Sequence, residues 1–417
     1  MESSGVVALR IAGFIGALLA VPCTVEASGF QLQEQSASGL GVAYAGMAAG
    51  TQDASTAFWN PAGLLERARG LEISGASVYV MPHTRYRSDS GSSSLDGGDG
   101  GVSSLIPSMY TRAPVSEKVA VGLAINAPFG LSTDWDSPWQ GMYQAIVSKS
   151  ETLNINPVVG VRVNPYVSFG GGVSYQRLKA KLTNAASPLV AGSEGRLDGE
   201  DWAWGWNLGA LLDLPSGTRL GATYRSHTDY TINGTLGFNN LALSALESNV
   251  TTSMRLPASA SIALSQRFGA NVRVLADYTW TEWKSIQALT VVATEGPRQG
   301  TVVSNTALNF DNSWRTGMGL EYSVRDSWLV RGGIAYDRSP VRSAFRTPRL
   351  PDADRTWLSI GAHWDATPKL SLDVGSAYLW VQKASSESVV TSPVPSTLTG
   401  EYRSHIVIVG SQASYRF

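Results

Sequence analysis

From about Leu71 to its C-terminus, the chain repeats a single pattern in which apolar side chains alternate with small or polar ones. In one such run, Trp202, Trp204 and Trp206 fall on one face, and Asn207 and several glycines fall on the other. Successive side chains of a β-strand point to opposite faces, so this alternation predicts strands with one apolar and one polar face. The pattern therefore predicts an all-β fold.

Fourteen segments carry this alternation. They are residues 69–81, 103–113, 117–127, 151–164, 166–183, 201–214, 218–236, 252–267, 270–293, 305–324, 327–338, 353–366, 369–384 and 401–417. Short turns and long polar connections follow one another in regular order between the segments. Bacterial outer-membrane barrels have an even strand number, short periplasmic turns and longer outer loops. We therefore predict a fourteen-stranded antiparallel transmembrane β-barrel over residues 69–417, located in the outer membrane of a Gram-negative bacterium.

The composition favours a membrane barrel over a soluble sandwich, which would show the same alternation. Charged residues make up 16% of the chain, against roughly 25% in soluble domains. A charge on the lipid face costs about 2–4 kcal/mol near the midplane. We therefore expect Arg255, Arg273, Arg315, Arg331 and Asp373 to point into the lumen, and tyrosines and tryptophans to form belts on the outer surface. The terminal Phe417 resembles the signal through which the barrel assembly machinery recognises its substrates.

The first residues have the pattern of a secretory signal. Arg10 precedes an apolar run over residues 11–21, and small residues follow at Val25-Glu26-Ala27. The run is too short to span a bilayer, which needs about 20 apolar residues. We assign residues 1–27 to a signal peptide. Cys23 permits a lipoprotein alternative, but it lies before the better cleavage site, and cleavage there leaves a mature chain without cysteine.

Residues 28–68 fit no ordinary element. They are rich in glycine, alanine and serine, nearly free of charge, and interrupted before any long period builds up. A barrel of fourteen strands leaves a lumen that something must fill if the membrane is not to leak. A disordered periplasmic leader is the alternative, although Phe30, Leu32, Tyr44 and Trp59 make the segment too apolar for a solvated tail. We predict a hatch, or plug, inside the lumen.

Five stretches of the chain resemble one known family. They are Ser28-Gly-Phe-Gln-Leu and the residues to Gly46, Asp53-Ala-Ser-Thr-Ala-Phe-Trp-Asn-Pro-Ala-Gly-Leu, Ala127-Pro-Phe-Gly-Leu-Ser-Thr-Asp-Trp with Asn154-Ile-Asn-Pro, and the closing Ser414-Tyr-Arg-Phe. They resemble the FadL/TodX family of outer-membrane transporters for long-chain fatty acids and aromatic hydrocarbons. Within the second stretch, Asn60, Pro61 and Ala62 form the family's hatch motif.

The resemblance implies passive uptake of a hydrophobic compound. Outer loops would capture the ligand, the hatch would gate the lumen, and a kink in the third strand would open a lateral path into the membrane. The strand over 117–127 alternates cleanly, so its sequence shows no kink; Gly122 and Pro128 are the candidate weak points.

The candidate substrate-binding residues come from the hatch, from two loops rich in apolar residues (128–150 and 237–251) and from arginines that could pair with a carboxylate. They are Phe30, Phe58, Trp59, Phe129, Leu131, Trp135, Trp139, Tyr143, Phe238, Leu241, Leu246, Arg225 and Arg315. We expect the two loops to form an apolar groove, with a short helix in the second loop. Interface anchoring or loop packing is the alternative for the apolar residues. Structural ion pairs with Asp229 or Asp277 are the alternative for the arginines.

Other classes of function receive little support from the sequence. There is no Gly-x-Ser-x-Gly elbow, so we expect no enzyme, and we expect no cofactor and no metal. The formal net charge of −1 and the scattered basic residues argue against nucleic acid. A general diffusion porin and a surface adhesin remain as alternatives. The expected partners are a hydrophobic ligand, outer-membrane lipid and lipopolysaccharide, and a monomer is expected.

Overall fold

The computed structural model describes residues 29–417 except 51, 67–69, 90, 92–94 and 391–393. The predicted signal peptide lies outside the described residues. The strands are β1 (Glu72–Ser88), β2 (Ser104–Pro114), β3 (Val119–Asn126), β4 (Gly130–Asp134), β5 (Val147–Arg162), β6 (Val167–Ala185), β7 (Glu194–Asp213), β8 (Thr218–Arg225), β9 (Thr228–Phe238), β10 (Ser248–Leu256), β11 (Ser259–Phe268), β12 (Val272–Thr281), β13 (Ala288–Ala293), β14 (Val302–Ala307), β15 (Ser313–Arg325), β16 (Trp328–Asp337), β17 (Arg355–Asp365), β18 (Leu370–Val381), β19 (Ala384–Val390) and β20 (Ser396–Arg416).

The helices in the described residues are short. They are the α-helices α2 (Ala37–Leu40) and α3 (Thr56–Trp59), and the 3₁₀ helices η1 (Met47–Ala49), η2 (Pro61–Gly63), η4 (Leu241–Leu246), η5 (Trp283–Ser285), η6 (Gly296–Arg298) and η7 (Ser343–Phe345). No helix in this part of the chain is long and apolar enough to cross a membrane.

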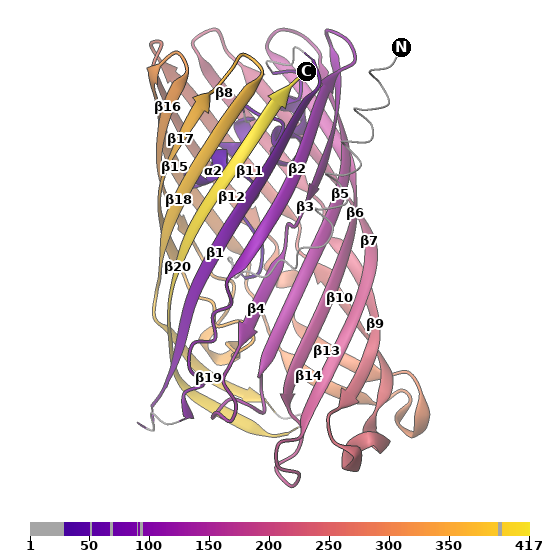
Figure 1. Ribbon diagram of the computed structural model, residues 1–417. Helices are drawn as coiled ribbons and strands as arrows, with labels where there is room; N and C mark the ends of the chain where they lie inside the picture. The colour runs from indigo at the N-terminus through magenta and orange to yellow at the C-terminus, as the bar shows by residue number, and fades with distance from the viewer. Residues whose placement is uncertain (1–28, 51, 67–69, 90, 92–94, 391–393) are drawn as a thin grey trace.

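The twenty strands form one closed antiparallel barrel (Figure 1). Six positions in the wall are each built from two consecutive strands, namely β3 with β4, β8 with β9, β10 with β11, β12 with β13, β14 with β15 and β18 with β19, so the wall has fourteen positions. The first and last strands close the ring, with β1 paired to β20 from Glu72↔Arg416 to Ser88↔Gly400. The predicted fourteen-stranded barrel is confirmed.

Several strands run beyond their predicted ends on the side of the long loops. β1 continues to Ser88 instead of residue 81, β5 begins at Val147 and β7 at Glu194. Beyond the lipid, neither face of a strand has to be apolar, so the alternation fades while the backbone ladder continues. Much of what the sequence indicated as long loop is therefore paired strand.

The predicted lipid-facing side is confirmed where the alternation is strongest. Trp204, Trp206 and Leu208 are exposed on the outer surface, Trp204 by 67%. On the inner side, Arg331 lies between Glu321 and Asp373, with its Nε 3.0 Å from Glu321 Oε1, and Arg273 also pairs with Glu321. These charges face the lumen as predicted.

The orientation predicted for Arg255 is wrong. Its neighbours Met254 and Leu256 face inward, and Arg255 lies on the outer surface with its Nε 2.6 Å from Asp229 Oδ1. The inward and outward faces exchange between β10 and β11, because Pro257 and Ala258 interrupt the strand. Ile262, beyond the interruption, is accordingly 63% exposed. A slip of one residue in a strand exchanges its two faces, and proline has no N–H for the ladder.

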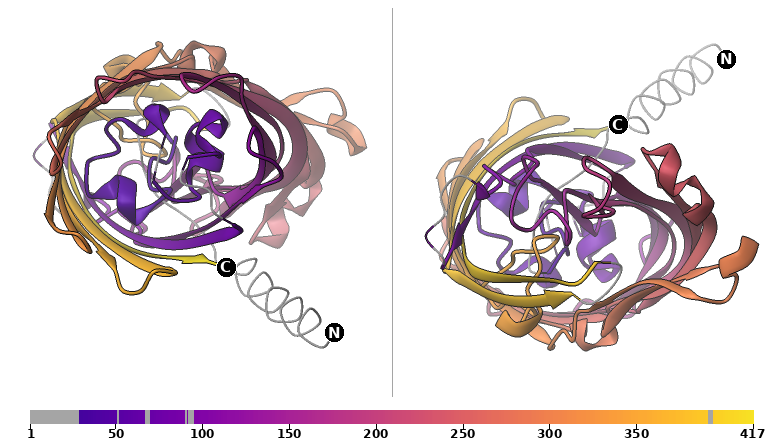
Figure 2. Two further views of the ribbon diagram at one scale, coloured as in Figure 1. Left: turned by 90° about the horizontal axis from the view of Figure 1, so that it is seen from above. Right: turned by 90° about the horizontal axis from the view of Figure 1, so that it is seen from below.

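Residues 29–50 and 52–66 lie inside the barrel and are called the lumenal segment below (Figure 2). Its α2 packs on β17, β18 and β20, its η1 on β8 and β11, and its η2 on β5, β6 and β7. Glycines of the wall allow this close approach: a Cβ on Gly221 would lie 1.9 Å from the carbonyl oxygen of Ala48, and one on Gly333 would lie 2.2 Å from the carbonyl carbon of Val42. The segment is therefore fitted to the wall backbone to backbone.

Candidate functional site

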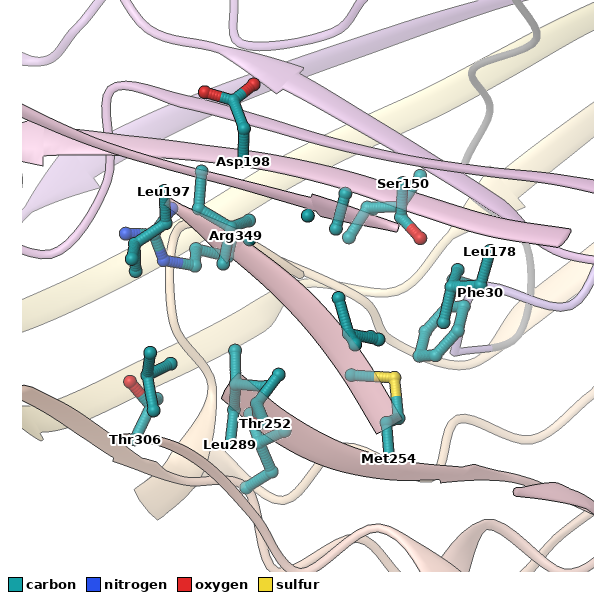
Figure 3. Close-up of a pocket in the computed structure, with 18 of the residues that line it drawn as sticks. Phe30, Ser150, Leu178, Leu197, Asp198, Thr252, Met254, Leu289, Thr306 and Arg349 are labelled. Carbon is teal, nitrogen blue, oxygen red and sulfur yellow. The ribbon is translucent and has the colours of Figure 1, made fainter. Parts of the chain in front are cut away.

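An apolar cavity, here called the outer chamber, lies in the lumen on the side of the long loops (Figure 3). The empty space between its lining residues, including the part open to solvent, is ≈ 1020 Å³. β6, β7, β9 and β10 each contribute inward-facing residues, and one residue comes from the lumenal segment. Its apolar lining consists of Phe30, Leu131, Leu178, Ala180, Leu182, Leu197, Ile232, Val250, Met254, Leu289, Val291, Leu308, Phe310 and Leu350. Such a cavity suits an apolar ligand.

Four aromatic side chains close the chamber toward the rest of the lumen. The Phe30 ring lies 4.8 Å from Trp283 and 5.9 Å from Phe129, centroid to centroid, and Phe310 lies 6.1 Å from Trp283. All four side chains are buried. We call them the aromatic cluster.

A second, more polar cavity lies on the other side of the aromatic cluster and is called the inner cavity. Its lining includes Gln31, Trp59, Phe129 and Arg225, and the empty space among its residues is ≈ 680 Å³. Phe30 lines the outer chamber, whereas residues 31–33, which follow it, line the inner cavity. The chain thus passes from one cavity to the other at Phe30.

The wall is interrupted beside this point. β3 ends at Asn126 and β4 begins at Gly130, and the residues between them pair with the lumenal segment instead. Leu32 N donates to Pro128 O (2.8 Å), and Gly130 N donates to Phe30 O (2.9 Å). Of the two predicted weak points, Pro128 lies in the interruption, whereas Gly122 is paired with Arg112 inside β3.

A chain of buried amides fixes the lumenal segment beside the interruption. Gln35 Nε2 donates to Ala127 O (2.8 Å), Asn126 Nδ2 donates to Gln35 Oε1 (2.8 Å), and Asn154 Nδ2 donates to Asn126 Oδ1 (2.8 Å). On the opposite side of Gln35, Ser108 Oγ and Tyr110 OH of β2 both donate to its carbonyl oxygen. Within the described residues, β2 pairs with β3 only from Met109 onward, so Gln35 lies beside the place where the ladder between these strands is missing.

Asn60, in the predicted hatch motif, holds the lumenal segment to the opposite wall. Asn60 Nδ2 donates to Ala48 O (2.6 Å) and to Ala210 O of β7 (3.2 Å), and Asn60 Oδ1 accepts from Ala62 N (3.0 Å). Pro61 begins η2 and, with Phe58 and Trp59, lines the inner cavity.

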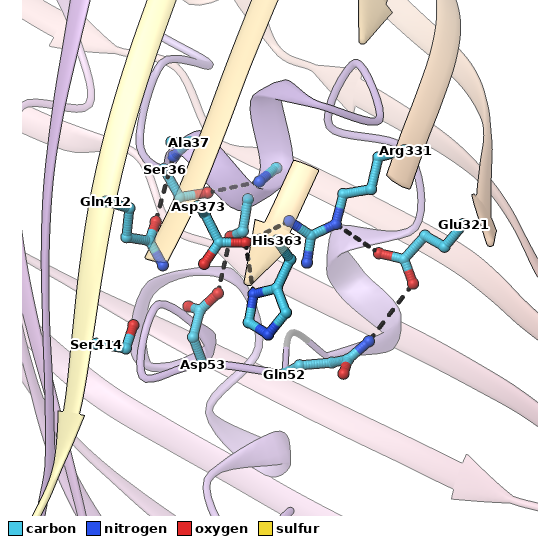
Figure 4. A network of polar contacts seen from close by, with 12 residues as sticks. Ser36, Ala37, Gln52, Asp53, Glu321, Arg331, His363, Asp373, Gln412 and Ser414 are labelled. Atoms are coloured by element: carbon cyan, nitrogen blue, oxygen red, sulfur yellow. Dashed lines mark hydrogen bonds and ion pairs between the residues drawn. The ribbon is translucent and has the colours of Figure 1, made fainter. Parts of the chain in front are cut away.

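Further polar contacts join the lumenal segment to the network of charges in the wall (Figure 4). Gln52 Nε2 donates to Glu321 Oε2 (3.4 Å), and Ala37 N donates to Gln412 Oε1 (3.2 Å). His363 Nδ1 lies 2.9 Å from Asp373 Oδ1 in the same network. The charges that face the lumen thus contact both the wall and the segment inside it.

The two predicted arginines have different surroundings. Arg225 lines the inner cavity, where its guanidinium lies 4.4 Å from the Phe58 ring and Nη2 donates to Phe58 O (3.0 Å). Arg315 lines neither cavity: it is buried, pairs with Asp277 (3.6 Å) and donates to Ala43 O. Arg315 thus forms the structural ion pair with Asp277 that was predicted from the sequence as the alternative to ligand binding.

The residues predicted from the two loops are not brought together. Trp135 and Trp139 stack at 4.7 Å and are buried, and their Nε1 atoms donate to Pro348 O and Ala145 O. The second loop does contain a short helix, η4, but Leu241 on it is 91% exposed. Of the loop candidates, Phe129 and Leu131 line the cavities; Trp135, Trp139, Tyr143, Phe238, Leu241 and Leu246 line neither.

The chamber also contains residues that the sequence did not single out. Arg349 and Leu350 come from the connection between β16 and β17, where no strand alternation marks an inward position. Trp283 of the aromatic cluster lies between two strands, in η5. Irregular segments give no periodic signal, so these residues could not be found from the pattern.

Buried charges surround the start of the lumenal segment. Asp352 Oδ2 accepts from Gly29 N (2.9 Å) and from Ser339 Oγ (2.6 Å), and Asp352 Oδ1 lies 3.1 Å from Arg355. Glu34 is buried near Arg355, and its Oε2 has no hydrogen-bond partner among the described residues. Burial raises the pKa of Glu34 to about 7.

Comparison with known proteins places these features in one family. The sequence model of the outer membrane protein transport protein family (OMPP1/FadL/TodX) matches residues 18–417. The 47 kDa outer membrane protein of Pasteurella multocida is 31% identical over 434 residues, covering 96% of this chain and 97% of the relative. The long-chain fatty acid transport protein of Escherichia coli K12 is 29% identical, covering 84% and 87%. A crystal structure of a Pseudomonas aeruginosa FadL homologue aligns with a TM-score of 0.85 at 25% identity, covering 93% and 100%.

Proposed function

The chain belongs to the OMPP1/FadL/TodX family of outer membrane transport proteins, and from this membership we propose that it mediates passive uptake of hydrophobic compounds, long-chain fatty acids or aromatic hydrocarbons, through the outer chamber. One observation carries the proposal: a chamber lined mostly by apolar side chains lies on the loop side of a lumen that the chain's own residues fill. Transfer of an apolar solute from water to such a lining lowers the free energy by roughly 25 cal/mol per Å² of buried apolar surface.

In this proposal, residues 28–68 act as a hatch. The wall glycines and the contacts of Asn60 support it, because they fit the lumenal segment tightly into the barrel. A ligand would displace the Phe30 side chain from the aromatic cluster and enter the inner cavity.

The exit in this proposal is lateral, through the interruption between β3 and β4. Two features support it: the missing ladder between the start of β2 and the β3–β4 junction, and the contacts of Phe30 and Leu32 at that junction. A lateral exit delivers the ligand to lipid and spares it passage through water.

The same proposal includes lipid and lipopolysaccharide around the barrel, the assembly machinery acting through Phe417, a cleaved signal peptide and a monomeric state. The exposed apolar belt, including Trp204 and Phe417 itself, supports the lipid partner.

The proposal is tested by uptake of a labelled panel of fatty acids, alkylbenzenes and hydrophilic solutes in cells that lack their own transporter of this kind. Expression of the chain is expected to increase uptake of the hydrophobic members alone. Uptake equal to that of the empty vector, or equal stimulation of hydrophilic solutes of similar size, would contradict it; the second result would favour the porin alternative.

A further inference from the structure

The outer surface of the barrel changes character along the seam where β1 and β20 pair (Figure 1). On β1, His83, Arg85 and Arg87 alternate with buried residues, so they point outward, and all three are exposed. The next outward residues toward the periplasm are Met81 and Tyr79. The surface of β1 therefore passes from an apolar zone to a cationic one as the strand approaches the outer loops.

β20 shows the same change at the neighbouring positions. The pairing of the two strands sets His83 opposite His405 and Arg85 opposite Arg403. The two imidazole rings stack with their centroids 4.9 Å apart, and Arg403 is exposed. Toward the periplasm the outward side of β20 is apolar, with Val409 42% exposed. A change of this kind across both strands is expected where the barrel leaves the hydrocarbon and enters the head groups of the outer leaflet.

Arg85 and Arg403 form a pair of like charges. Side chains directly opposite each other on an antiparallel pair have Cβ atoms about 5 Å apart, and like charges at such positions destabilise the sheet. Arg403 is bonded to Glu401 on its own strand, with its Nε 2.6 Å from Glu401 Oε1. The Arg85 side chain has no hydrogen bond or ion pair with any of the described residues. The pair therefore keeps an excess of positive charge.

The carboxylate on the other side of β1 is bonded to other groups. Asp99 lies opposite Arg85 in an isolated bridge. Its Oδ1 accepts from Thr84 N (2.8 Å) and from Gly101 N (3.0 Å), and its Oδ2 lies 2.8 Å from His83 Nδ1. Asp99 thus holds the loop against β1 and orients the imidazole, and it does not bond the Arg85 guanidinium.

A third cation lies beside the two arginines. Lys383 is exposed and directly precedes β19, whose pairing with β20 begins next to Arg403. The exposed acids Asp89 and Glu387 lie farther toward the loops than Arg85 and Lys383. Positive charge therefore gathers next to the apolar zone, and negative charge lies beyond it. Arg85, Arg403 and Lys383 are called the cationic patch below.

A like-charge pair on another part of the wall is balanced by carboxylates. Lys149 of β5 and Lys181 of β6 also lie opposite each other. However, Lys149 Nζ is 2.6 Å from Glu151 Oε1, and Lys181 lies opposite Asp198 of β7. The cationic patch lacks such compensation at Arg85, so an anion from outside the protein would relieve the repulsion there.

We propose that the cationic patch binds the phosphate groups of a lipopolysaccharide molecule in the outer leaflet, whose acyl chains lie against the apolar zone of β1 and β20. This inference rests on the lipopolysaccharide partner of the proposed function and gives that partner a site. Lipopolysaccharide carries phosphates on the sugars directly above its acyl chains, which matches a cationic patch bordering an apolar surface. A guanidinium offers two parallel N–H donors to a phosphate, and a phosphate between two arginines replaces their repulsion with attraction.

The test measures binding of lipid A, the phosphorylated and acylated part of lipopolysaccharide, to the purified full-length protein in detergent micelles. EDTA is present so that divalent cations form no bridge. Combined Arg85→Gln and Arg403→Gln substitution is expected to weaken binding roughly 10- to 30-fold, about fivefold for each arginine beside an anionic lipid surface. Lipid A without its phosphates is expected to bind more weakly than lipid A, and equally to the wild type and this double variant.

Lys179→Gln is the matched control. Lys179 is an exposed outward cation of β6 that lies opposite Glu151 of β5 and Glu200 of β7, and its loss is expected to leave lipid A binding unchanged. An equal loss in the control and the double variant would show a general effect of net charge and would overturn the site. Equal affinity of the wild type for lipid A with and without phosphates would overturn it as well.

Inorganic pyrophosphate distinguishes a lipid site from a site for free anions. It has no acyl chains to cover the apolar zone, so at equal concentration it is expected not to displace lipid A. Displacement would show that the patch recognises a soluble phosphate and would contradict the proposal.

Thermal unfolding separates ligand binding from a structural role of Arg85. Without lipid A, Arg85→Gln is expected to have the same Tm as the wild type or a higher one, because a like-charge repulsion is removed. Lipid A is expected to raise the Tm of the wild type more than that of the variant. A lower Tm of Arg85→Gln without lipid A would show that the arginine stabilises the barrel itself and would overturn the proposal.

If the double variant does not assemble, Arg85→Gln alone carries the binding test, with an expected loss of about fivefold. Unchanged affinity of this variant for lipid A would reject the site. These failures concern the outer surface alone, whereas the uptake panel decides the proposed transport independently.

Discussion

At the scale of single residues, the lumen contains ionisable side chains whose pKa values are shifted by burial. Glu34 and Arg349 both face the lumen, and neither forms a salt bridge with another of the described residues. Arg349 opens onto a cavity, whereas Glu34 is enclosed by protein. The first can therefore meet a ligand, and the second affects the stability of the lumenal segment.

Glu34 makes the stability depend on pH. Its folded pKa of about 7 is above the ordinary value of 4.5, so the folded state binds the proton more tightly. The resulting stabilisation is complete below about pH 4.5 and is lost as the pH rises through 7. For Glu34→Gln, the fall in unfolding free energy between pH 5 and pH 8 is expected to be smaller by an amount on the order of 1–3 kcal/mol. Urea titrations in detergent micelles measure this; an unchanged pH profile would contradict it.

Phe30 separates the two cavities, and its truncation should join them. Phe30→Ala removes the ring that contacts both Phe129 and Trp283. Uptake of bulky hydrophobic probes is expected to rise, and discrimination between probes of different width to fall, while assembly is retained. Phe268→Ala, on the lipid-exposed end of β11, is the control. Unchanged probe selectivity of Phe30→Ala would show that the ring is not the barrier.

At the scale of elements, the wall is shaped to receive the lumenal segment. Gly221→Val is expected to displace η1, because the added Cβ would meet Ala48 O at 1.9 Å. The barrel should still form, and steady ion conductance in planar bilayers should increase. Gly75→Val is the matched control, since a Cβ there meets nothing within 4 Å. Equal conductance of the two variants would argue against a tight fit.

The elements also show what the sequence could and could not predict. Lipid requires an apolar residue at every second position, so strands such as the one with Trp204 were found with their faces correct. The side chain of Arg255 was predicted on the wrong face because the interruption at Pro257 exchanges the inward and outward faces of the strand. A single sequence does not show on which side of such an interruption the predicted faces are wrong. Arg349 was missed because its loop has no period, and its position is set by Trp135 and other residues distant in the chain.

At the scale of the whole molecule, a closed lumen distinguishes the proposed transporter from a porin. The purified wild type is expected to show no large steady conductance in planar bilayers. Deletion of residues 28–50 is expected to leave a barrel that assembles but conducts ions and loses selective uptake. Large conductance of the wild type, or a deletion variant that stays electrically closed and takes up ligand normally, would contradict the hatch.

The closure of the barrel by its first and last strands has a consequence for folding. β1 pairs with β20, the strand nearest the C-terminus, over its whole length, so the ring is completed only when the two ends of the chain meet. The lumenal segment precedes β1, yet it lies within that ring. The barrel therefore has to close around the lumenal segment. The β1–β20 contacts that enclose the segment have the greatest sequence separation in the wall, and contacts of this kind form slowly.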